Sequence, residues 1–114
     1  MALDPFPYND TTTTTCEALC MGVPVVTLRG ERYAARVGAG LLGQAGLPNL
    51  IAGSAEDYVA IASPLAADPV RLASLRSSLR QRLMTSPLCD GAGFARNMEA
   101  AYRKMWQCWC AAPE

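Results

Sequence analysis

The chain has 114 residues, of which 51% are hydrophobic, and it carries ten basic side chains, ten acidic side chains and no histidine. This size and composition fit one folded domain and exclude a disordered chain. The balanced charge argues against nucleic acid as a partner, and the lack of histidine excludes any mechanism in which the chain supplies its own histidine base.

The apolar residues are spread along the chain, and no stretch approaches about 18 uninterrupted apolar residues. We therefore expect no membrane partner, and the N-terminus has neither the basic start nor the apolar centre of a secretory signal. The five cysteines include no Cys-x-x-Cys pair. We expect no metal site, and we expect reduced, mostly buried thiols in a cytoplasmic protein.

The first third of the chain predicts a loop, a helix and a strand. Two prolines in Leu3–Asp10 indicate an extended loop. A helical pattern follows from about Thr13 to Met21, and Gly22 stands where a helix ends. The run "VPVVTL" (23–28) is short and β-branched, which is typical of a buried strand.

A second helix and a second strand are expected in the middle of the chain. The helix covers about residues 30–46, with Tyr33, Val37 and Leu41 on one face. Its glycines require close packing, because each weakens an isolated helix by up to about 1 kcal/mol. The brief run "PNLIA" (48–52) is the candidate strand.

Three further helices are expected after residue 53. Ser54 and Asp57 have the spacing of an N-terminal cap, and Pro64 is expected to end or kink this helix. Asp68 and Pro69 begin the next helix, and the last one covers about 90–110. The apolar faces are Tyr58, Ile61 and Leu65; then Leu72, Leu75, Leu79 and Leu83; then Phe94, Met98, Tyr102, Met105 and Trp109. The arginines of the middle helix are expected to form a solvated face: Arg71, Arg76, Arg80 and Arg82.

Strands separated by helices predict an α/β fold with parallel pairing. Two strands make a poor sheet, because parallel strands are normally flanked by others and covered on both faces. The sequence therefore predicts a helix-rich α/β fold, in which residues 1–114 are the last part of a larger α/β domain.

Five consecutive threonines, Thr11–Thr15, stand at the start of the first predicted helix, and Glu17 follows within its first turns. A helix N-terminus attracts phosphate through its backbone N–H groups and the helix dipole, and hydroxyls add donors. A carboxylate one turn later can accept hydrogen bonds from a ribose. The same residues also suit a plain polar helix entry, so the pattern alone leaves both interpretations open.

The combination of four segments resembles the O-linked N-acetylglucosamine transferase and SPINDLY-like glycosyltransferase family. They are the threonine run with "CEAL", "MGVPVVTL", "GERYAARV", and "SPLCD", and the resemblance extends from Leu3 to about Trp109. It implies a partial Rossmann-like domain, namely the distal part of the second domain of a GT-B glycosyltransferase. It also implies that the donor is a UDP-sugar, that N-acetylglucosamine is transferred to protein serine or threonine, and that no metal or other cofactor takes part.

Site residues follow from the same resemblance. In the family, threonines at this helix start contact the diphosphate, and the acid one turn later contacts the ribose. Counted back from Glu17, these threonines fall on Thr13 and Thr14, with Thr12 just before them. The residues that the family uses for catalysis lie in segments preceding this one, so no catalytic residue is expected here.

The chain departs from the family pattern just before the threonines. Asp10, Thr11 and Thr12 stand where the family has a glycine-containing pair, so this part of the chain is one residue longer. This departure blurs the register, and Asp10 brings a carboxylate toward an anionic ligand. The alternative is a non-catalytic remnant or interaction module that packs on another chain through its apolar helices and open sheet edge.

Overall fold

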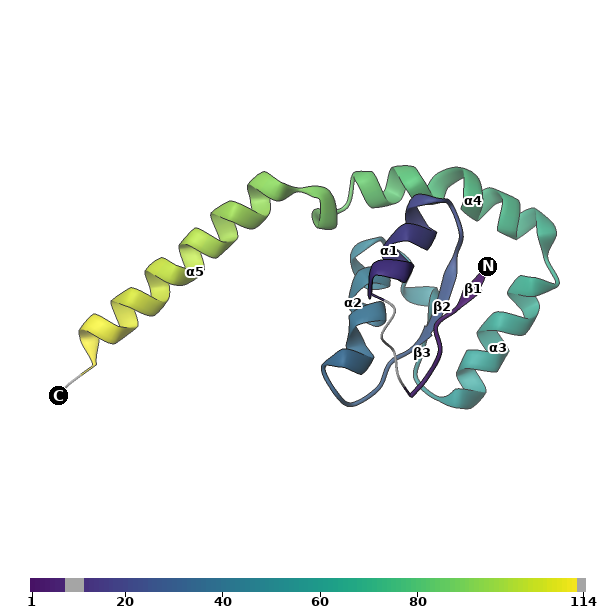
Figure 1. Cartoon of the computed structure of the whole chain (residues 1–114), viewed down its shortest axis with the longest axis horizontal. Helices are drawn as coiled ribbons and strands as arrows, with labels where there is room; N and C mark the ends of the chain where they lie inside the picture. The colour runs from purple at the N-terminus through teal and green to yellow at the C-terminus, as the bar shows by residue number, and fades with distance from the viewer. Residues whose placement is uncertain (8–11, 113–114) are drawn as a thin grey trace.

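A parallel sheet of three strands forms the centre of the molecule, in a computed structural model that describes residues 1–7 and 12–112 (Figure 1). The strands are β1 (Ala2–Leu3), β2 (Val25–Leu28) and β3 (Ile51–Ala52), in the order β1-β2-β3. Ala2 pairs with Val25, and Thr27 pairs with Ile51. The predicted parallel pairing of the strands now labelled β2 and β3 is confirmed. β1 is an additional strand that the sequence analysis did not predict.

Helices cover both faces of this sheet. α1 (Thr12–Cys20) and α2 (Val37–Gln44) lie on one face, and α3 (Ala55–Ala66) lies on the other (Figure 1). α4 (Pro69–Met84) crosses one end and contacts both α1 and α3. The core between these layers consists of buried side chains that include Leu19, Val25, Val26, Leu42, Leu47, Leu50, Tyr58, Leu65, Leu79 and Leu83. A parallel sheet that is covered on both faces is what the alternation of helices and strands predicts.

The predicted starts of α3 and α4 are confirmed in atomic detail. The Ser54 hydroxyl accepts a hydrogen bond from the Asp57 N–H at 3.1 Å. The Asp68 carboxylate accepts one from the Arg71 N–H at 2.8 Å. Both caps satisfy backbone donors that a helix leaves unpaired in its first turn. The predicted arginine face of α4 is exposed, and its leucine stripe is buried or packed against the core.

Two sequence predictions about helices differ from the structure. Pro64 lies inside α3 and does not end it, because the helix continues to Ala66. The second helix is regular only over α2 and begins with a 3-10 turn, η1 (Ala34–Arg36). Its buried residues are Gly38 and Leu42 rather than the predicted face, and Tyr33 is 87% exposed.

Short 3-10 turns connect the remaining elements. Pro48–Leu50 forms a second 3-10 turn, η2, so that only Ile51–Ala52 of the predicted second strand pairs in the sheet. A third turn, η3 (Pro87–Cys89), leads to α5 (Gly91–Ala111).

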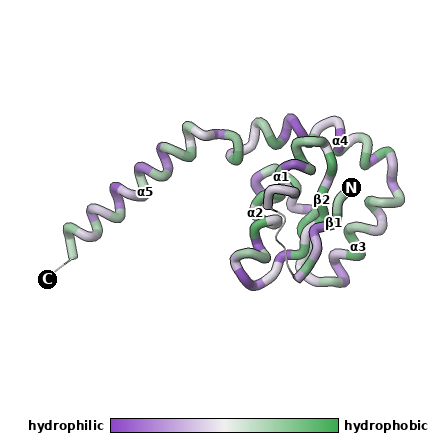
Figure 2. The backbone as a smooth tube through the Cα atoms, in the orientation of Figure 1, coloured by the Kyte–Doolittle hydropathy of each residue, from purple (hydrophilic) through white to green (hydrophobic). Residues whose placement is uncertain are grey.

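α5 projects away from the domain, which gives the molecule its extent of 62 Å (Figure 1). Apolar and polar residues alternate along it in the manner of an amphipathic helix (Figure 2). No residue of α5 is buried. The predicted helix is therefore confirmed, whereas its apolar side is exposed: Phe94 is 65%, Tyr102 60% and Trp109 76% exposed.

Removal of residues 91–114 is expected to change the free energy of unfolding by no more than about 1 kcal/mol, because no side chain that the structure describes between residues 91 and 112 is buried. Urea denaturation of the full and shortened chains measures this difference. Leu79→Ala provides the contrast: this side chain is 1% exposed, and its truncation should cost about 2–5 kcal/mol. Loss of cooperative unfolding in the shortened chain would show that α5 supports the core.

Candidate functional site

The N-terminus of α1 lies at the carboxyl edge of the sheet. β1 and β2 are parallel and α1 connects them, so α1 starts at the edge where β1 and β2 end. In open α/β sheets this edge is where ligands bind, because loops there diverge and helix N-termini point toward the crevice. The topology therefore places the predicted site residues at a suitable edge.

The predicted site residues are all exposed in the first half of α1. Thr12, Thr13 and Thr14 form the first turn of the helix and are exposed, and Glu17 is exposed as well. Glu17 is three residues beyond Thr14 and four beyond Thr13, which is the spacing of neighbours on one helix face. The structure thus brings together the first-turn N–H groups, two threonine hydroxyls and one carboxylate.

The remaining members of the helix start have other surroundings. Thr15 is 2% exposed, so it faces the core and not the edge. Cys16 is half-buried, and its burial, followed by the neighbouring Cys20, raises the pKa of its thiol. A thiol with a raised pKa is protonated at neutral pH and is a poor nucleophile. Asp10 and Thr11, where the chain departs from the family pattern, lie outside the described residues.

A buried carboxylate stabilises this edge of the sheet. Asp4 follows β1 directly, is 2% exposed, and accepts a hydrogen bond of 2.6 Å from the Thr27 hydroxyl of β2. The Tyr58 hydroxyl of α3 donates to the Asp4 carbonyl at 2.9 Å. Burial, and then the charge of Asp4, raise the pKa of Tyr58, which keeps this donor protonated. Asp4 therefore ties the end of β1 to β2 and α3.

α2 approaches this buried group closely because residue 38 is glycine. A Cβ atom at Gly38 would lie 2.7 Å from the Asp4 carboxylate and 2.7 Å from the Thr27 hydroxyl. Sequence reasoning placed Asp4 in a loop and missed its role. The only sequence signal was an acidic residue next to a short apolar run, which is too common to be diagnostic.

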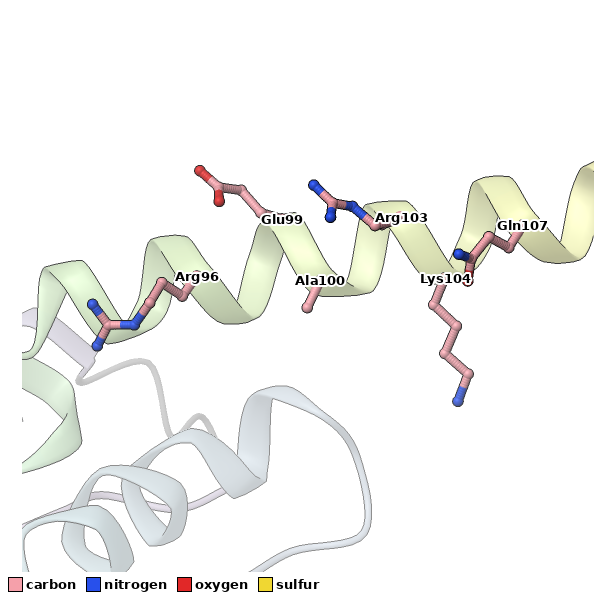
Figure 3. Close-up of a pocket in the computed structure, with 6 residues that line it drawn as sticks. All are labelled: Arg96, Glu99, Ala100, Arg103, Lys104 and Gln107. Carbon is pink, nitrogen blue, oxygen red and sulfur yellow. The ribbon is translucent and has the colours of Figure 1, made fainter.

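A second surface, on α5, is polar but open. A pocket there is lined by Arg96, Glu99, Ala100, Arg103, Lys104 and Gln107. All of these residues belong to one helix, and their long side chains extend away from it in different directions (Figure 3). A ligand site needs converging groups from several directions, so this surface is a weaker candidate than the α1 edge.

The cysteines correct one sequence prediction. All five are free thiols, Cys16 is half-buried, and the others are exposed: Cys20, Cys89, Cys108 and Cys110. The expectation of mostly buried thiols is wrong, because α5 packs on no core and Cys20 faces outward from α1.

Within residues 1–7 and 12–112, no three His, Cys, Asp or Glu side chains come close enough to hold a metal ion. No helix in the same part of the chain could cross a membrane.

Comparisons with known proteins agree on one relationship. Residues 1–98 match the model of glycosyl transferase family 41. The chain is 52% identical over 110 residues to a protein of Solanum lycopersicum named probable UDP-N-acetylglucosamine–peptide N-acetylglucosaminyltransferase SPINDLY, which covers 96% of this chain and 12% of that protein. It is 34% identical over 95 residues to the UDP-N-acetylglucosamine–peptide N-acetylglucosaminyltransferase of Caenorhabditis elegans, covering 83% of this chain and 8% of that protein.

A solved structure shows the same arrangement of elements. It is a mutant O-GlcNAc transferase of Thermobaculum terrenum, with a TM-score of 0.85 and 45% identity. The match covers 98% of this chain and 22% of that one. The chain thus spans less than a quarter of the length of each of these proteins.

Proposed function

The chain belongs to glycosyl transferase family 41, and on this basis we propose that it holds the UDP end of a nucleotide sugar. In this proposal the chain is the distal part of the second Rossmann-like domain of a GT-B glycosyltransferase. The observation that carries the proposal is the exposed surface of Thr12, Thr13, Thr14 and Glu17 at the N-terminus of α1.

The chemistry of this surface matches the two charged or polar parts of UDP. The hydroxyls of Thr13 and Thr14, with Thr12 beside them, donate to diphosphate oxygens together with the first-turn N–H groups. The helix dipole adds a favourable interaction with the negative charge. Glu17, one turn further along the helix, accepts hydrogen bonds from the ribose hydroxyls. No metal ion is needed in this scheme, because the charge is met by hydrogen-bond donors.

The reaction of the whole enzyme is part of the proposal. The relatives are named as transferases that act with UDP-N-acetylglucosamine on peptides. We assign to this protein the transfer of N-acetylglucosamine from UDP to a protein serine or threonine. In this scheme the present segment contributes donor binding and no catalytic residue. Four exposed free thiols support a reducing compartment such as the cytoplasm.

An interaction module without catalytic function is the second candidate. Its support is α5, which exposes large apolar side chains along one face, as surfaces that bind other proteins do. We rank it second, because a docking helix is equally compatible with a glycosyltransferase and does not explain the polar edge at α1.

UDP is expected to bind the chain roughly tenfold or more tightly than uridine, since only UDP presents charge to the helix N-terminus and the threonines. Titrations followed by ¹⁵N NMR measure even millimolar affinities and locate the binding on α1. EDTA should leave the UDP affinity unchanged. Equal affinities for UDP and uridine, or shifts confined to another element, would contradict the proposal.

A further inference from the structure

α5 carries apolar residues with the spacing that lets two helices pair. These residues are separated alternately by four and three positions, and we call them the α5 seam: Phe94, Met98, Ala101, Met105 and Cys108. A mean spacing of 3.5 residues keeps their side chains on one side of the helix, as in paired helices. The polar residues Arg96, Glu99, Arg103 and Gln107 occupy positions outside the seam (Figure 3). Because α5 projects from the domain (Figure 1), a second helix can lie along the seam without moving the core.

A hollow in the α5 seam has the residue spacing that receives a side chain from a second helix. It is lined by six residues at intervals of three and four positions along α5 and its C-terminal end, namely Ala101, Lys104, Met105, Cys108, Trp109 and Ala112. The first four of them are neighbours on one helix surface. In paired helices, four such residues form the hole into which one large side chain of the facing helix inserts.

The α5 seam and the aromatic residues beside it expose enough area for a specific interface. Phe94, Tyr102 and Trp109 are 65%, 60% and 76% exposed. An aromatic side chain buries about 150–250 Å², so these three offer roughly 300–500 Å² per chain. Met98 and Met105, which are 41% and 65% exposed, add to this area. Two copies together can then bury on the order of 1,000 Å², the size at which specific protein interfaces begin.

We propose that the α5 seam binds the α5 seam of a second copy of this chain and forms a symmetric dimer. In such a dimer the same patch serves both copies, so it must offer large and small side chains together. Phe94 and Met105 are large, whereas Ala101 and Cys108 are small and line the hollow. The formal net charge of the chain is zero, so two copies meet no net repulsion. The seam is separate from the α1 surface, and the inference does not depend on UDP binding.

Met105→Glu tests the inference. In sedimentation equilibrium between about 10 µM and 1 mM, the mass of the unaltered chain should rise from 12.2 kDa toward twice that value, since a small interface gives a weak complex. Met105→Glu should weaken the dimer by about tenfold or more, because it removes an apolar contact and places a charge in the seam. Gln107→Glu is the matched control: it adds the same charge outside the seam and should leave the dimer unchanged. Both side chains are exposed in the single chain, and circular dichroism reports whether the helices are intact.

Three results would overturn the inference. The first is an unaltered chain that stays monomeric up to about 1 mM, because the seam then serves a different partner. The second is a dimer that Met105→Glu leaves unchanged, since the contact then lies elsewhere on the chain. The third is equal weakening by Met105→Glu and Gln107→Glu, because charge and not the seam then controls association. None of these results changes the proposed function, which the UDP titration tests separately.

Discussion

Replacement of Thr13 and Thr14 together with valine is expected to lower the affinity for UDP by roughly tenfold or more. Valine keeps the shape of threonine but removes two hydroxyl donors from an exposed first turn. Each hydrogen bond to a charged group is worth about 1.5–3 kcal/mol, and about 1.4 kcal/mol corresponds to a factor of ten. Titration with UDP measures the change. Glu17→Gln should have a smaller effect, because it loses charge at the ribose and keeps an acceptor.

A matched control separates this effect from a general effect of losing a hydroxyl. Thr85 stands at the C-terminal cap of α4, where its hydroxyl donates to the Gln81 carbonyl at 2.9 Å. Thr85→Val makes the same chemical change at the negative end of a helix, so the UDP affinity should not change. An equal UDP affinity for the unaltered chain and the Thr13/Thr14 double variant would remove the threonines from the phosphate site. The run would then be a polar helix entry.

Gly22→Ala is expected to destabilise the fold by about 2–5 kcal/mol. Gly22 follows α1 with φ of 73°, a conformation that costs other L-residues about 1–2 kcal/mol. A Cβ atom there would also lie 2.8 Å from the Arg76 carbonyl oxygen of α4. Relief of that contact requires α1 and α4 to move apart, and such overpacking costs about 1–3 kcal/mol more. Urea denaturation gives the free energy of unfolding.

Gly46→Ala separates the conformational cost of a positive φ from the steric cost of the contact with Arg76. Gly46 has φ of 72°, and a Cβ atom added there meets no atom within 4 Å. Its replacement should therefore cost only the conformational part, about 1–2 kcal/mol. If Gly22→Ala and Gly46→Ala destabilise the chain equally, the contact with Arg76 contributes nothing and the helices adjust freely.

Local interactions explain which features the sequence predicted well. The caps at Ser54 and Asp68 join residues three apart, so the pattern needed to recognise them lies within one helical turn. Thr13, Thr14 and Glu17 likewise lie on one short helix, so their positions as neighbours follow from the helical repeat alone. The resemblance to the family also depended on such contiguous segments, and the match over residues 1–98 confirmed it.

The tertiary structure decided the features that join distant parts of the chain. β1 is two residues long, and only its pairing with β2 distinguishes it from a loop. The bond between Thr27 and Asp4 spans 23 positions, and the contact between Tyr58 and Asp4 spans 54. α2 faces the core with Gly38 because the buried Asp4 and Thr27 leave no room for a Cβ atom.

Burial and pockets depend on the same long-range pairings. The five cysteines look alike in the sequence, and only packing determines that Cys16 is partly buried while the others are exposed. Phe6 lines one pocket together with Glu31 and Arg32, because β1 and β2 pair in parallel and end together. Helical periodicity and capping involve residues within about one turn of each other, so they can be recognised in the sequence. The position of one strand end beside another depends instead on the free energy of the whole packed core.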